Sequence, residues 1–132
     1  MHIAMTLQGS EQTREKPLPA DIIVDAFLVA SYQQGWSSNH SDLVRKIMEI
    51  KERGVDIRNV NLYNRASGLY SEDLDRFVSI LGTSNVSDFS PIRLTPSGYA
   101  KCMTLLKKYQ TKSEYRNQLT TLNNALSIRL DS

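Results

Sequence analysis

The chain has 132 residues and a formal net charge of +2, with 16 lysine and arginine residues against 14 aspartate and glutamate residues. This length predicts one domain around one hydrophobic core, and so small a charge does not by itself indicate a nucleic-acid partner. Cys102 cannot form a disulfide within the chain, and without a secretory leader we expect a cytoplasmic protein. The longest apolar run, residues 22–30, is interrupted by Asp25 and is shorter than the roughly 20 residues of a membrane span, so no membrane partner is expected.

The first half of the chain predicts a tail followed by two helices. Residues 1–16 show no sustained period and predict a flexible N-terminal tail. Residues 21–34 are apolar on nearly every side before Gly35, which predicts a helix in the middle of the domain. Residues 37–54 predict an amphipathic helix, with His40 as a solvent-side residue near its start. Residues 55–70 lose this period, and a short strand or an irregular crossing is expected there rather than a helix.

A third, short helix is predicted over residues 71–82. Ser71 is a good N-cap, the acidic residues after it suit the first turn, and one apolar face precedes Gly82. Residues 85–95 then predict a small β-hairpin, because apolar and polar residues alternate in its second arm. We therefore expect a mainly α fold with a small β-hairpin.

The hairpin is expected to run directly into a fourth helix. Thr95 can accept a hydrogen bond from the first helical turn, and Pro96 at the first helical position loses no needed donor. Four side chains fall together on the face opposite the apolar one if this helix continues past residue 111: Lys101, Lys108, Lys112 and Arg116. Residues 111–114 form a capping-box pattern, so a break near residue 111 remains the alternative.

The C-terminal segment, residues 111–132, has an apolar seam of the coiled-coil type. The seam consists of Tyr115, Leu119, Leu122 and Leu126. Because a seam of about two heptads is marginal alone, two interpretations remain open. It extends the interface of a homodimer, or it docks on the domain.

Basic residues are concentrated near the C-terminus. Residues 91–116 contain six basic residues and one acidic residue, a net charge of +5, so the remainder carries −3. A polyanionic partner should therefore prefer this region.

The order of predicted elements resembles the winged helix-turn-helix domain of MarR-type and PadR-type regulators. In that family the second wing strand runs into a Leu-Thr-x-x-Gly segment, and Leu94, Thr95 and Gly98 match it. The segment GLYSEDLDRFVSILG, residues 68–82, looks like the short helix that precedes the wing. The resemblance implies a winged-helix domain over residues 17–110 with an extra C-terminal helix, and it places helix 71–82 in the recognition position.

Two functions are compatible with this fold. The first is a dimeric transcriptional regulator that binds double-stranded DNA through Arg65, Arg93 and the basic residues at positions 101, 108, 112 and 116. The alternative is a protein-interaction module that binds no nucleic acid and docks a basic partner on Glu72, Asp73 and Asp75. These acids leave helix 71–82 with a net charge of −2, which would repel duplex phosphates.

Catalysis is the least favoured class of function. The six glycines are scattered and form no phosphate-binding loop, and no arrangement of nucleophile, histidine and carboxylate stands out. His2 and His40 lack partners at ligand spacing, so neither a metal site nor a cofactor is expected. Cys102 falls on an apolar face, where thiols are usually inert.

Overall fold

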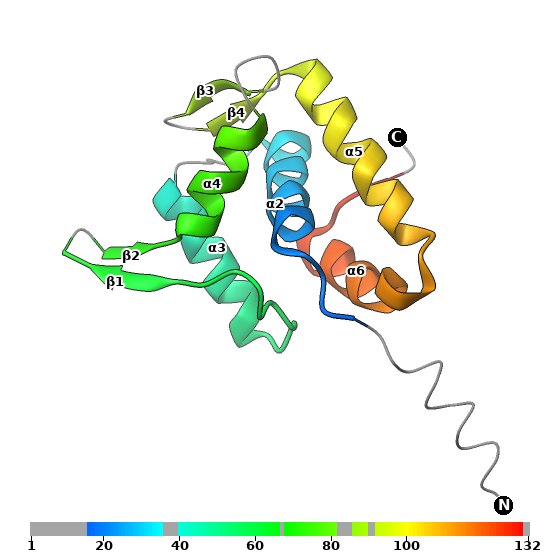
Figure 1. Cartoon of the computed structure of the whole chain (residues 1–132), viewed down its shortest axis with the longest axis horizontal. Coiled ribbons are helices and arrows are strands. Elements are labelled where there is room, and N and C mark those ends of the chain that lie inside the picture. Colours follow the sequence, from blue (N-terminus) through cyan, green and yellow to red (C-terminus); the bar gives the residue numbers. More distant parts are fainter. Residues whose placement is uncertain (1–15, 36–39, 67, 82–85, 90–91, 131–132) are drawn as a thin grey trace, which may run out of the picture.

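The computed structural model describes residues 16–35, 40–66, 68–81, 86–89 and 92–130, which form the mainly helical fold of Figure 1. The helices are α2 (Ala20–Gln34), α3 (His40–Glu52), α4 (Glu72–Leu81), α5 (Pro96–Gln110) and α6 (Ser113–Leu126). The strands are β1 (Tyr63–Arg65), β2 (Gly68–Tyr70), β3 (Val86–Phe89) and β4 (Ile92–Leu94). The predicted mainly α class with a small hairpin is confirmed. All of the predicted N-terminal tail except Lys16 lies outside the described residues.

Helix α2 forms the centre of the fold, as its sequence predicts. All residues from Ile22 to Ser31 are buried, so the helix has no solvent face over this stretch. Figure 1 shows α4 on one side of α2 and α5 on the other. The helix ends at Gly35, which has a left-handed conformation (φ +72°) and donates its N–H to the carbonyl of Ser31.

Helix α3 is amphipathic and is followed by a long connection. Its apolar face contributes Leu43, Val44, Ile47 and Ile50 to the core. Residues 53–62 contain no helix or strand, and β1 then pairs with β2 as an antiparallel hairpin in which Tyr63 is opposite Tyr70. Both structures expected for residues 55–70 are therefore present, an irregular crossing and short strands. The connection from α3 to α4 is much longer than the three or four residues of a helix-turn-helix turn.

Helix α4 and the second hairpin follow the predicted signals. The Ser71 hydroxyl accepts a hydrogen bond from the Leu74 N–H (3.2 Å), which confirms Ser71 as the N-cap. Strands β3 and β4 pair antiparallel, with a register irregularity between Val86 and Asp88. Thr95 then accepts a hydrogen bond from the Gly98 N–H (3.0 Å), and Pro96 begins α5. The predicted passage from strand to helix across one residue is confirmed.

The last two helices are separate and belong to the same core as the rest. Helix α5 ends at Gln110, and Lys112 is the N-cap of α6, so the alternative of a break near residue 111 is correct. Three α6 leucines are almost fully buried in the single chain: Leu119, Leu122 and Leu126. The predicted boundary after residue 110 therefore does not separate two independently packed parts.

The first described residue, Lys16, lies against α6. Lys16 donates its backbone N–H to the carbonyl of Glu114 (3.0 Å), and the Gln118 side chain donates to the Lys16 carbonyl (2.7 Å). Leu18 is then buried in the core just before α2 starts. No helix in the described ranges combines the length and hydrophobicity needed to cross a bilayer.

Candidate nucleic-acid interface

The solvent face of α5 carries three lysines. Lys101, Lys107 and Lys108 are exposed, whereas Cys102, Met103 and Leu106 of the same helix are buried against the core. Lys101 and Lys108 are seven residues apart, so their Cα atoms project within about 20° of each other and lie about 10 Å apart along the axis. Small exposed residues lie between these lysines, namely Ala100 and Thr104. This face of α5 is therefore positively charged, and only small side chains lie between the lysines.

These three lysines form no ion pair with a described residue, in contrast to many cations elsewhere in the fold. Six other cations lie 3.8 Å or less from a carboxylate oxygen: Lys16, Arg45, Lys46, Arg58, Arg65 and Arg76. The charge of the α5 lysines is thus available to an external anion without the loss of an intramolecular pair.

The break between α5 and α6 removes two residues from the predicted basic stripe. The Lys112 ammonium lies over the Tyr109 ring, 4.5 Å from its centroid. Arg116 donates from Nε to the Gln110 carbonyl (3.2 Å) and from Nη2 to the Thr111 carbonyl (3.1 Å), which satisfies the end of α5. Both cations therefore stabilise the turn between the helices.

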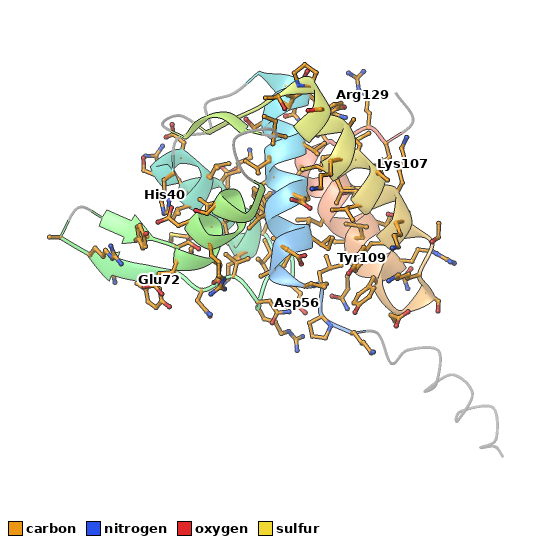
Figure 2. The ribbon with its side chains drawn as sticks, turned by 45° about the horizontal axis from the view of Figure 1, so that its top comes forward. His40, Asp56, Glu72, Lys107, Tyr109 and Arg129 are labelled. Carbon is orange, nitrogen blue, oxygen red and sulfur yellow. The ribbon has the colours of Figure 1, made fainter. Side chains whose placement is uncertain are left out.

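The structure does not bring Arg65 together with the α5 lysines. Arg65 lies in β1, where its guanidinium carbon is 3.6 Å from the centroid of the Tyr70 ring and Nη2 is 3.8 Å from Glu72. Figure 2 shows Glu72 and Lys107 on opposite sides of α2. Arg93 lies in β4, directly before α5, and its side chain is outside the described part of the structure. The predicted binding set is therefore not a single surface.

The acids of α4 are engaged within the chain. Asp73 is only 8% exposed, accepts a hydrogen bond from the Asn61 N–H (2.8 Å) and pairs with Arg76. Asp73 therefore cannot join the predicted acidic docking surface without the loss of its contacts with Asn61 and Arg76. Glu72 and Asp75 are exposed, but Glu72 pairs with Arg65, and Asp75 accepts a hydrogen bond from His40.

His40 connects α3, β2 and α4, which corrects the expectation of a solvent-side residue. Its Nε2 accepts a hydrogen bond from the Ser71 N–H (3.1 Å), so Nδ1 carries the proton and donates to Asp75 (3.0 Å). The imidazole also stacks on the Tyr70 ring, with centroids 4.5 Å apart. Sequence spacing gives no signal for this cluster, because 35 residues separate His40 from Asp75.

A buried pair joins α2 to α5. The Cys102 thiol donates a hydrogen bond to Asp25 Oδ1 (3.5 Å), and both side chains are buried. Burial raises the pKa of Asp25 to about 7, although the Cys102 hydrogen bond opposes this rise. Burial and the neighbouring carboxyl group likewise raise the pKa of the Cys102 thiol, so the thiolate that nucleophilic chemistry needs is disfavoured. The pair joins two helices, and the ligand groups required for a metal centre are not assembled within the described ranges.

The C-terminal seam faces the interior of the chain. Leu119, Leu122 and Leu126 are 0%, 1% and 3% exposed, and the Tyr115 ring packs against Tyr109 with centroids 5.1 Å apart. They do not form the exposed dimerisation surface that the seam predicted, because the core of the same chain already covers the leucines. The other predicted possibility, docking on the domain, is what the structure has.

A functional conclusion for this protein rests on its residues and their geometry, because the comparisons with known proteins found no match. Neither the protein-family models, nor the curated proteins, nor the solved structures include a match to this chain.

Proposed function

We propose that the protein is a DNA-binding transcriptional regulator of the winged-helix type that contacts duplex phosphates through the lysine face of α5, defined as Lys101, Lys107 and Lys108. One observation carries this proposal. These lysines share the solvent face of one helix and form no ion pair with a carboxylate of the described residues. Binding to phosphates would therefore release counterions without breaking an ion pair of the fold.

The order of elements supports the winged-helix part of the proposal. Helix α4 precedes the β3–β4 hairpin, and this hairpin enters α5 through the Leu-Thr-x-x-Gly segment. The long connection between α3 and α4 departs from the helix-turn-helix pattern. The acids of the first turn of α4 also disfavour deep entry of its N-terminus into a groove. Phosphate contacts by α5 are therefore expected to dominate, with little dependence on base sequence.

The alternative, a protein-interaction module built on the acids of α4, has less support. Asp73 is buried, and Glu72 and Asp75 would have to exchange their partners Arg65 and His40 for those of a second protein. That exchange removes much of the gain from a new surface ion pair, which is small in any case.

Fluorescence anisotropy with nonspecific duplex DNA over a range of salt concentrations tests the proposal. We expect affinity to fall steeply with salt, and the triple variant Lys101→Ala, Lys107→Ala, Lys108→Ala should reduce the slope of log K against log salt by about 2.7, at about 0.9 per phosphate contact. All three side chains are exposed, so the fold should be preserved.

A second triple variant controls for net charge. Arg45→Ala, Lys51→Ala and Arg53→Ala remove the same three charges from exposed positions on or just after α3. This variant should retain most of the slope of the unmodified protein. Equal losses in both triples would show that only net charge matters, and no detectable binding at about 50 mM salt would refute DNA binding.

A further inference from the structure

An open pocket of about 210 Å³ lies between the end of α5, the second half of α6 and the segment that follows α6. Four polar and two aliphatic residues line it: Gln110, Thr120, Asn123, Asn124, Ile128 and Leu130. None of these side chains is charged. The walls therefore suit a neutral molecule better than a phosphate or a carboxylate.

The wall formed by residues 127–130 is held in place by hydrogen bonds. Ser127 has a left-handed conformation (φ 58°), and the Ile128 N–H donates to the Asn123 carbonyl (2.9 Å). One residue further, Gln33 of α2 donates from Nε2 to the Arg129 carbonyl (2.7 Å) and accepts from the Arg129 N–H (2.9 Å). Hydrogen bonds to α6 and to α2 therefore hold this wall of the pocket in place.

Asn123 is the unusual residue of this pocket. The residue is only 6% exposed, yet Oδ1 has no hydrogen-bond donor in the described structure, and Nδ2 reaches only Gln110 Oε1 at the long distance of 3.5 Å. The Gln110 amide is oriented by a short bond from Nε2 to Thr120 Oγ1 (2.7 Å). A buried amide that is so poorly satisfied is destabilising and gains free energy when a donor and an acceptor reach it.

We propose that this pocket binds a small, uncharged, planar molecule that presents an N–H donor beside an acceptor atom, as the edge of a nucleobase does. Asn123 lines the pocket, and the terminal torsion of asparagine has a broad energy minimum, so its amide can reorient at low cost to meet a ligand. An asparagine amide pairs with such an edge through two hydrogen bonds. Ile128 and Leu130 supply apolar contact for the ring.

The probes that test the proposal with the unmodified protein are the 9-methyl derivatives of adenine and purine, called adenine and purine below, because the methyl group removes the ring N–H donor that both free bases carry. Adenine carries an amino donor beside the N7 acceptor, and purine has the same rings without the amino group. In ¹H–¹⁵N spectra, adenine should shift the side-chain amide signals of Gln110 and Asn123 saturably, with a millimolar Kd. Purine should bind about tenfold more weakly, because Oδ1 would remain without a donor.

Two variants locate the site. Asn123→Ala should abolish the saturable shifts of adenine, with folding verified by the dispersion of the backbone signals. Gln118→Ala is the matched control, since Gln118 Oε1 is the other buried atom that lacks a partner in the described structure and Gln118 does not line the pocket. It should bind adenine as the unmodified protein does.

Several outcomes would overturn the proposal. They are the absence of saturable shifts with adenine, equal affinity for adenine and purine, and unchanged adenine binding by Asn123→Ala. A crystal structure grown with adenine in which only water reaches Asn123 would do the same. Because no DNA is present in these experiments, their result is independent of whether the α5 lysines bind phosphates.

Discussion

Replacing Asp25 by asparagine should stabilise the protein at neutral pH and remove part of its pH dependence. Asp25 is 5% exposed within the central helix, and burial raises its pKa from 3.8 to about 7. Asparagine has nearly the same shape and cannot ionise. The substitution therefore removes the cost of the buried charge while keeping the packing between α2 and α5.

The size of the effect follows from the difference in pKa between the folded and unfolded states. A rise from 3.8 to about 7 is about three pK units, which corresponds to about 4 kcal/mol at 1.36 kcal/mol per unit. The folded state binds this proton more tightly than the unfolded state. The contribution of Asp25 to stability is therefore most favourable below pH 3.8, falls as the pH rises from 3.8 to about 7, and stays reduced at higher pH.

Urea unfolding of both proteins across the pH range checks this reasoning. The variant and the unmodified protein should have similar free energies of unfolding near pH 4, and the variant should be more stable by up to about 4 kcal/mol near pH 8. The difference between the two curves isolates Asp25, because the other titrating groups are common to both proteins.

Asp56→Asn is the matched control, because its effect on stability at neutral pH should have the opposite sign to that of Asp25→Asn. Asp56 is exposed, and its hydrogen bonds with Arg58 lower its pKa, so Asp56→Asn should remove a small stabilisation that is present at neutral pH.

A difference between Asp25→Asn and the unmodified protein that does not change with pH would show that Asp25 titrates normally. Lower stability of Asp25→Asn at every pH would show that the folded protein requires the carboxyl group itself.

Three further substitutions test the packing and the helix ends by urea unfolding. Leu122→Ala should lower the free energy of unfolding by about 2–5 kcal/mol, because Leu122 is 1% exposed, and an unchanged midpoint would mean that α6 does not pack on the core. Ser71→Ala should cost about 0.5–2 kcal/mol through loss of the cap on Leu74, and an unchanged midpoint would contradict this cap. Gly35→Ala should cost about 1 kcal/mol, because its φ of +72° disfavours a side chain even though no atom lies near the added Cβ, and no loss would contradict this backbone conformation.

Much of the fold could be predicted because its signals are local. The central position of α2 follows from its lack of a polar face between Ile22 and Ala30, and the caps at Ser71 and Thr95 follow from side chains that bond three residues ahead. Residues 55–70 gave weaker signals because Val55, Ile57 and Val60 follow no single period. Ile57 and Val60 are nevertheless buried, in a segment without regular structure.

The candidate interface could be predicted only in part. The excess of positive charge in residues 91–116 directs attention to α5, but the charge count cannot show which cations are already engaged within the fold. Arg116 is held by two backbone carbonyls, and Arg65 is held by Tyr70 and Glu72. The stripe predicted for a continuous helix does not include Lys107, because Lys107 lies about 100° from Lys108 around the helix axis.

The amino-acid sequence by itself determines where most helices begin and end, since hydrogen-bond caps and apolar periodicity act within a few residues. Only the tertiary structure decides what the α6 leucines cover, what neutralises the acids of α4, and which lysines remain available. The physical reason is that burial and charge pairing depend on surfaces that meet across the fold, as His40 and Asp75 meet over 35 residues of chain. A periodic pattern specifies an apolar or a charged face, but the partner of that face is specified by the packing of the whole domain.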